Sequence, residues 1–160
     1  PRRYSSAASD VYKRQQKNYI SNNFEFAFGQ HSGVIDLNKD RYELPRFPIN
    51  EKYGEIKRFK EVISYLPLQY KIIKPENKFM NDGENPPKMT IEFFKDQKNL
   101  ENINCFSNEG SKWRKTKIIL NDNILSINFS EKFIERRGRI NCSLKDESGW
   151  RFSGFQFVQN

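Results

Sequence analysis

The sequence predicts an α+β protein, in which an N-terminal part with one helix precedes a small all-β immunoglobulin-like sandwich. Three observations carry this prediction. Residues 56–66 repeat apolar side chains with the period of a helix. Residues 75–89 are rich in Pro, Gly, Asn and Asp, which mark loops and turns. Six short segments with strand-like composition then follow at a spacing of about ten residues, which is typical of a sandwich.

Residues 1–15 do not resemble the rest of the chain. They show no apolar period, and residues 6–15 closely resemble a translated sequencing-adapter artefact found at the ends of metagenomic reading frames. We therefore treat residues 1–15 as non-native and disordered, with a natural disordered tail as the alternative, and expect native sequence upstream of residue 16 to be missing. The segment holds four basic residues and one acidic residue, which leaves 24 basic and 19 acidic residues, a net charge of +5, in residues 16–160.

Residues 16–74 form the N-terminal part. Three phenylalanines alternate with other residues over 24–28, which predicts a short half-buried strand. Residues 42–49 are expected to be extended, because two prolines there exclude a helix. The helix at 56–66 ends at Pro67, and residues 68–73 resemble a strand.

Residues 75–89 are interpreted as a linker and residues 90–160 as the sandwich domain. The predicted strands are residues 90–94, 103–107, 116–120, 124–129, 138–144 and 150–158. Asn121, Asp122 and Asn123 separate two of them, which predicts a tight hairpin.

Composition limits the classes of function. The chain has 14 Phe, 7 Tyr and 2 Trp, enough for a core although only 36% of its residues are hydrophobic. It lacks the run of about 18 apolar residues that a membrane-spanning helix needs. One His and two Cys exclude a site built from several histidines or four thiolates.

Three side chains could carry chemistry. His31 lies in a Gly-flanked loop, where it could be a general base, a single metal ligand or a substrate contact, although a structural histidine is more common. Cys105 and Cys142 fall on two predicted strands. They could form a disulfide between the two sheets, as in immunoglobulin-like domains, or stay as two buried thiols.

Basic residues gather in the sandwich, and they could contact phosphates. They are Lys112, Arg114, Lys115, Lys117, Arg136, Arg137 and Arg139. No recognised nucleic-acid motif accompanies them, and charged strand edges explain the same residues. We therefore expect no nucleic-acid partner.

Eight motifs in order resemble the C-terminal part of bacterial polysaccharide deacetylases of the NodB-homology, carbohydrate esterase family 4 type. They are residues 28–34 (FGQHSGV), 44–51 (LPRFPINE), 53–54 (YG), 66–68 (LPL), 85–87 (NPP), 105–107 (CFS), 139–142 (RINC) and 150–157 (WRFSGFQF). The resemblance implies that residues 16–74 are the terminal elements of a (β/α) barrel. It also implies that Gln30, His31, Arg46 and Asn50 border the substrate pocket.

The same resemblance implies a parent enzyme that hydrolyses N-acetyl groups of an amino-sugar polymer. Such enzymes hold a zinc-like divalent metal with an Asp and two His, and the metal polarises the acetyl carbonyl and activates water. This chain has no Asp-Asp pair and no His-x-x-x-His motif. We therefore carry over no catalytic residue and no metal ligand, expect no cofactor in this fragment, and expect the fragment itself to be inactive.

The expected partners are a polysaccharide, reached through the parent enzyme, and the missing N-terminal catalytic half. An exported, periplasmic or membrane-associated location is implied by the family only. The alternative is a stand-alone carbohydrate-binding or accessory sandwich without enzymatic activity.

Overall fold

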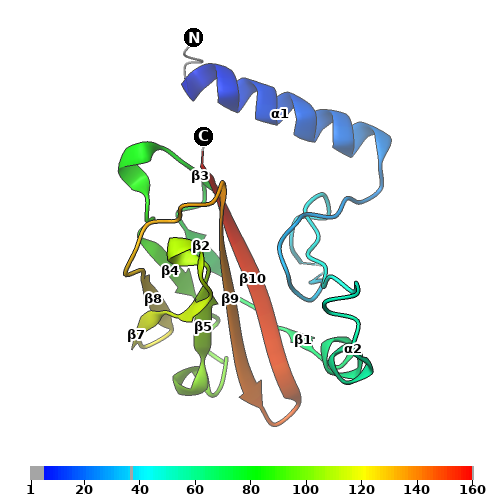
Figure 1. The fold of residues 1–160 in the computed structure, drawn as a ribbon, viewed down its shortest axis with the longest axis vertical. Helices are drawn as coiled ribbons and strands as arrows, with labels where there is room; N and C mark the ends of the chain where they lie inside the picture. Colours follow the sequence, from blue (N-terminus) through cyan, green and yellow to red (C-terminus); the bar gives the residue numbers. More distant parts are fainter. Residues whose placement is uncertain (1–5, 37, 160) are drawn as a thin grey trace.

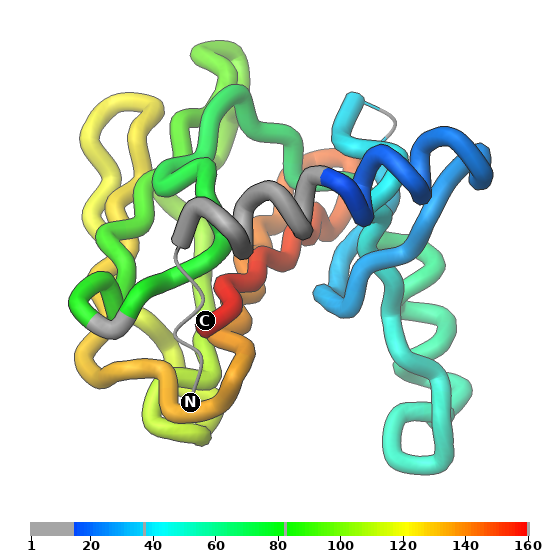
Figure 2. The backbone as a smooth tube through the Cα atoms, turned by 90° about the horizontal axis from the view of Figure 1, so that it is seen from above, coloured from blue at the N-terminus to red at the C-terminus, as the bar shows by residue number. Residues whose placement is uncertain are grey.

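The computed structural model describes residues 6–36 and 38–159, and strands dominate it. Strands make up 35% and helices 17% of the structure. Figure 1 shows the two helices, α1 (Ser6–Asn23) and α2 (Ile56–Ile63), beside a body of β-strands. Seen from above, residues 15–36 and 38–63, called the N-terminal segment below, lie next to this body rather than inside it (Figure 2).

The described strands form two sheets. The six-stranded sheet contains β1 (Leu66–Pro67), β3 (Phe79–Met80), β5 (Asn104–Ser107), β6 (Arg114–Lys115), β9 (Arg137–Asp146) and β10 (Gly149–Gln159). Its order is β1-β10-β9-β5-β6, with β3 also paired to β10. The β9–β10 hairpin is its centre, and the short strands β1 and β3 run parallel to β10. The C-terminal hairpin thus pairs with strands from several earlier parts of the chain.

The four-stranded sheet is entirely antiparallel. It contains β2 (Ile72–Lys74), β4 (Met89–Glu92), β7 (Lys117–Asn121) and β8 (Ile124–Asn128), in the order β2-β4-β8-β7. A two-residue turn joins β7 and β8, and Asp122 adopts the positive φ that such turns require. Three short 3₁₀ helices, η1 (Asp82–Glu84), η2 (Leu100–Asn102) and η3 (Glu109–Ser111), complete the connections among the described residues.

The hydrophobic core lies between the two sheets. It combines Met89 and Ile91 of β4 with Ile140 and Leu144 of β9, and all four are almost fully buried. Strand β9 buries every second residue, as a strand with one face on a core must. The residues between them, Arg139 among others, therefore point away from the core.

The prediction of barrel elements is wrong. Among the described residues, positions 24–63 contribute one helix and one isolated parallel bridge, between Phe28 and Leu44, instead of alternating strands and helices. Prolines interrupt this stretch, and they cannot donate the hydrogen bonds that a continuous barrel strand needs. The α+β prediction is corrected accordingly: the protein is mainly β, with two sheets that face each other as in a sandwich.

Three stretches of the chain also have a structure that differs from the one predicted. Residues 6–15, expected to be disordered, belong to α1, whereas residues 1–5 lie outside the described part of the chain. Residues 75–89, expected as a linker, supply β3 and the buried Met80. Residues 24–28 form no strand, and their phenylalanines are exposed.

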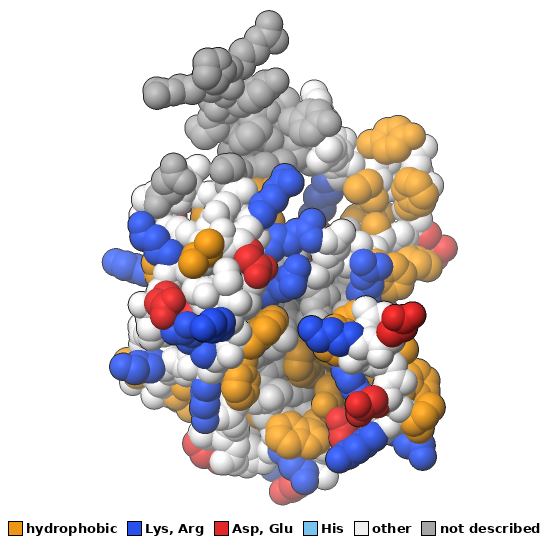
Figure 3. All heavy atoms as spheres, in the orientation of Figure 1, with side chains coloured by type: hydrophobic (Ala, Val, Ile, Leu, Met, Phe, Trp, Pro, Cys, Tyr) orange, Lys and Arg blue, Asp and Glu red, His pale blue; other side chains and the backbone are white. Residues whose placement is uncertain are grey.

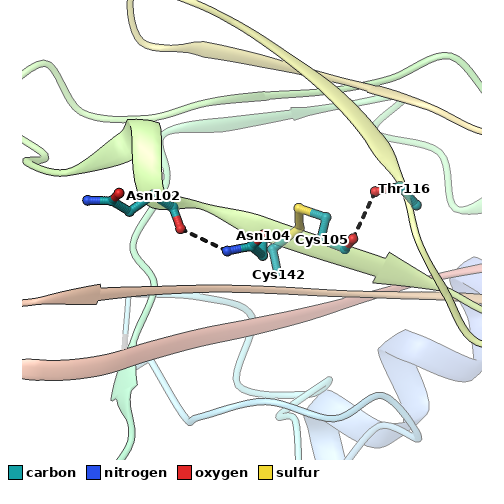
Figure 4. The surroundings of a disulfide bond; sticks show 5 residues. All are labelled: Asn102, Asn104, Cys105, Thr116 and Cys142. Atoms are coloured by element: carbon teal, nitrogen blue, oxygen red, sulfur yellow. Dashed lines mark hydrogen bonds between the residues drawn. A yellow bond between two sulfur atoms is a disulfide. The ribbon is translucent and has the colours of Figure 1, made fainter.

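A disulfide joins Cys105 to Cys142 (Figure 4). The two residues face each other directly on the neighbouring strands β5 and β9, with Cα atoms 4.1 Å apart. Of the two alternatives that the sequence leaves open, the structure has the disulfide rather than two free thiols, but it lies within one sheet instead of joining two. Thr116 donates its hydroxyl to the Cys105 carbonyl at 3.1 Å, which ties the start of β7 to this position.

Candidate functional site

A groove of about 500 Å³ lies between the N-terminal segment and the face of β9 that points away from the core. It is lined by Gln30, His31, Ser32, Arg46, Pro48, Tyr53, Arg58, Trp113, Arg139, Asn141 and Phe155. No Asp or Glu is among these described lining residues. Figure 3 shows Lys and Arg side chains spread over this face of the molecule, several of them near its middle, with fewer Asp and Glu side chains among them.

Two loop segments form one wall of the groove, and backbone hydrogen bonds hold them together. The Gly29 amide donates to the Leu44 carbonyl at 2.8 Å, and the Arg46 amide donates to the His31 carbonyl at 3.1 Å. Strand β10 carries Gly154 where the carbonyl of Ser32 packs against it, and a side chain there would overlap that carbonyl. The missing side chain therefore lets the loop that carries His31 lie directly on the sheet.

Aromatic packing fixes the second of these segments. The Phe47 ring packs edge-on against Phe152 of β10, with ring centroids 5.1 Å apart, and against Tyr65 at 5.8 Å. Tyr65 and Phe152 stack on each other with nearly parallel rings. Because Phe47 immediately follows Arg46, this cluster holds the Arg46 backbone at the edge of the groove.

His31 is half-buried in the groove. Burial lowers its pKa below the ordinary value of 6.5; Glu43 acts in the opposite direction, and Lys78 lowers the pKa further. The imidazole is therefore neutral at pH 7, with one nitrogen that donates and one that accepts. Its Nδ1 has no hydrogen-bond partner among the described residues.

Three arginines surround the groove, and their environments differ. Arg58 donates to the carbonyls of Pro48 at 2.9 Å and Tyr53 at 3.0 Å, and its guanidinium lies 5.1 Å from the centre of the Tyr53 ring. Arg139 holds a buried Nε that lacks a partner within the described part of the chain. Arg46 is exposed. One arginine is thus engaged by the protein, and two are able to meet a ligand.

Two aromatic side chains face solvent at the groove. Trp113 is 51% exposed and Tyr53 is 38% exposed. Trp113 follows η3, which is anchored by Glu109: its buried carboxylate accepts the backbone amide of Glu131 at 2.8 Å and the Ser107 hydroxyl at 3.1 Å. A large indole held on an anchored loop provides a flat surface for a ligand.

The structure brings together three of the four residues expected at the pocket border. Gln30, His31 and Arg46 line the groove, and Gln30 accepts a hydrogen bond from Arg137 of β9. Asn50 does not line it. Its side-chain oxygen accepts the Tyr53 amide at 3.1 Å, so Asn50 shapes the turn that carries Tyr53.

Sequence reasoning did not connect these residues with the other half of the groove, although it named Arg139 as a basic residue that could contact phosphates. Trp113, Arg139 and Asn141 come from the second half of the chain, more than 50 residues from Arg58. The polar residues at 139 and 141, alternating with buried ones, were the available signal for a ligand-facing side of β9. What covers that side of β9 depends on long-range packing of the N-terminal segment, which the local sequence does not show.

The divalent metal implied by the deacetylase resemblance does not fit the described residues. No group of three His, Cys, Asp or Glu side chains is close enough there to hold a metal ion. We therefore derive no step through a metal. No helix in the described part of the chain is long and apolar enough to cross a membrane.

No family model matches the chain, and neither a curated protein nor a solved structure matches it. The deacetylase resemblance accordingly stays a prediction that rests on the motifs in residues 28–157. The geometry and charge of the groove are therefore the evidence from which a function can be inferred.

Proposed function

We propose that this chain binds a polysaccharide in the groove between its N-terminal segment and β9. The observation that carries the proposal is the half-exposed Trp113 in a groove otherwise lined largely by polar and guanidinium side chains. A sugar ring has an apolar face that packs on an aromatic ring and hydroxyls that need hydrogen-bond partners. Asn141, Gln30 and Arg139 offer such partners around the indole.

The disulfide supports a partner outside the cytosol. Cys105 and Cys142 are both fully buried, and disulfides persist mainly in secreted, periplasmic or cell-surface proteins. Polysaccharides are abundant ligands in those compartments. The location itself is part of the proposal.

A second candidate is the C-terminal part of a polysaccharide deacetylase. One observation favours it: the motifs at residues 28–34, 44–51 and 139–142 are far apart in the sequence, yet all contribute to one groove. In this proposal the groove would hold the polymer for a catalytic part that carries the metal ligands. The purified chain should then release no acetate from an N-acetylglucosamine oligomer with added zinc, and acetate release would contradict its inactivity.

The two tryptophans provide a matched test of binding. Trp150 on β10 is 46% exposed but does not line the groove, so it is the control for Trp113. Calorimetric titration with a panel of cell-surface polysaccharides should show binding that Trp113→Ala weakens about tenfold, or ~1.4 kcal/mol. Trp150→Ala should bind as the unmodified chain does. Equal affinities of the two variants, or no binding to any polymer, would contradict the proposal.

A further inference from the structure

The groove is positively charged without compensation. Arg46, Arg58 and Arg139 line it, and none of its described lining residues is acidic. Glu43, the acidic residue that acts on the pKa of His31, is itself paired with Lys78. A negatively charged ligand would therefore meet arginines that have no carboxylate partner among the described lining residues of the groove.

Arg139 is the most specific feature of this charge. Asn108 holds its backbone, accepting the Arg139 amide at 2.6 Å through its side-chain oxygen, so the position of the residue on β9 is fixed. Its buried Nε nevertheless has no acceptor among the described residues. The protein thus engages this guanidinium incompletely, and the part of the residue that lines the groove can donate to an oxyanion.

We propose that the polysaccharide bound in this groove is acidic and carries carboxylates, as uronic acid units do. This inference rests on the proposed function and specifies its ligand. A guanidinium matches a carboxylate with two parallel hydrogen bonds, and such charge-assisted bonds are the stronger kind. Arg139 and Arg46 receive the carboxylate, and Trp113 packs against a sugar ring. A deacetylated polymer, whose amines are protonated, is repelled.

Single-stranded nucleic acid is the other anionic polymer with flat rings, and the structure favours it less. Of the nearby basic residues, Arg114 is paired with Glu131 and Arg137 donates to Gln30, so neither adds an unengaged cation to the groove. The buried disulfide is also typical of compartments where cell-surface polysaccharides, rather than nucleic acids, are the abundant polymers.

The test compares ligands that differ mainly in charge. The full chain is titrated with a hyaluronan oligomer, which alternates glucuronate and N-acetylglucosamine, and with an N-acetylglucosamine oligomer and a glucosamine oligomer of equal length. A thymidine oligonucleotide is the fourth ligand. The hyaluronan oligomer should bind at least about tenfold more tightly than the neutral oligomer, and the glucosamine oligomer most weakly. Binding should weaken as salt increases, because salt screens charge.

Charge-matched variants locate the effect. Arg139→Gln and Arg46→Gln should each lower affinity for the hyaluronan oligomer about tenfold. The loss for the neutral oligomer should be much smaller, because glutamine keeps a side-chain donor for sugar hydroxyls. Lys117→Gln removes the same charge from β7 of the other sheet and should change affinity less than twofold. Arg46 is exposed, so its variant keeps the test valid if Arg139→Gln fails to fold.

The outcomes separate this inference from the proposed function. Equal binding of acidic and neutral oligomers, with a loss in Trp113→Ala, would overturn the acidic ligand and leave polysaccharide binding intact. Tighter binding of the oligonucleotide than of the hyaluronan oligomer would also overturn it. Binding to none of the sugars, here and in the wider panel, would overturn both.

Discussion

His31 should make the stability of the protein depend on pH. Burial lowers its pKa below 6.5, so the unfolded chain takes up a proton at higher pH than the folded protein does. The free energy of unfolding should therefore fall as the pH drops through about 6.5 and continue to fall until the folded form also protonates. Urea unfolding between about pH 5 and pH 7 should show this slope, and His31→Gln should flatten it.

Two carboxylates with lowered pKa values, Asp146 and Asp40, lie outside this pH window. Arg151 holds the pKa of Asp146 below its ordinary value of 3.8, chiefly through a side-chain hydrogen bond. The pKa of Asp40 is also lowered: burial acts against the change, and the hydrogen bond from Lys17 favours it. Both carboxylates therefore titrate below the pH range of the urea experiment. The same slope in the unmodified chain and in His31→Gln would show that His31 is not the cause.

Gly154 determines how closely the His31 loop approaches the sheet. A methyl group there would overlap the Ser32 carbonyl and lie 3.0 Å from the Asn141 side-chain oxygen. Gly154→Ala should therefore displace the loop, lower stability by about 1–3 kcal/mol, and weaken polysaccharide binding several-fold. Gly83→Ala is the control, since a Cβ at that glycine meets no atom within 4 Å. Thermal unfolding and calorimetry measure both effects, and identical behaviour of the two variants would contradict this role.

Among the elements, the disulfide connects β5 to β9, and its two cysteines are 37 residues apart in the sequence. Its loss should lower the free energy of unfolding by about 3–4 kcal/mol, mainly because the unfolded chain gains freedom. The test compares the oxidised protein, the same protein with reductant, and the double variant Cys105→Ala/Cys142→Ala. Reductant should destabilise the first and have no effect on the variant. If full reduction of the disulfide leaves the free energy of unfolding of the unmodified protein unchanged, the prediction is contradicted.

The strands of the second half can be predicted from local pattern, whereas their partners cannot. The expected strand at 138–144 corresponds to β9, where alternation of buried residues reflects one covered face. The expected strand at 150–158 corresponds to β10, which buries its residues without strict alternation. The pattern does not say which sheet a strand joins. For this reason the sequence leaves a disulfide between the sheets as one of two alternatives, although β5 and β9 are neighbours in one sheet.

Short elements and long-range contacts escape prediction for a related reason. Strands β1 and β3 have two residues each, which are too few to show a period. Both form by parallel pairing with β10, a partner that is distant in the sequence. The groove depends on the same kind of contact. Gln30 and His31 belong to a motif that draws attention to them, but nothing local to Trp113 indicates that it lies across from them.

In the molecule as a whole, the N-terminal segment exposes an apolar surface. Helix α2 buries none of its residues, and Ile56 and Ile63 are 70% and 65% exposed. Surfaces of this kind promote association. We expect the isolated chain to self-associate with increasing concentration in sedimentation velocity, and Ile56→Lys/Ile63→Lys to shift it toward monomer.

A control variant distinguishes this helix from apolar exposure in general. Ile119 on β7 is also exposed, and Ile119→Lys should leave the association unchanged. A monomer at every concentration, or an equal response to the β7 variant, would show that α2 is not an association surface.

One groove, formed by segments distant in sequence, is proposed to bind an acidic polysaccharide. An NMR titration of the ¹⁵N-labelled chain with the hyaluronan oligomer tests this most directly. Chemical-shift changes should concentrate at the Trp113 indole, the amides of His31 and Arg46, and the Asn141 side chain, all of which belong to the groove. Changes confined to β7 and β8, or none at saturating oligomer, would contradict binding in the groove.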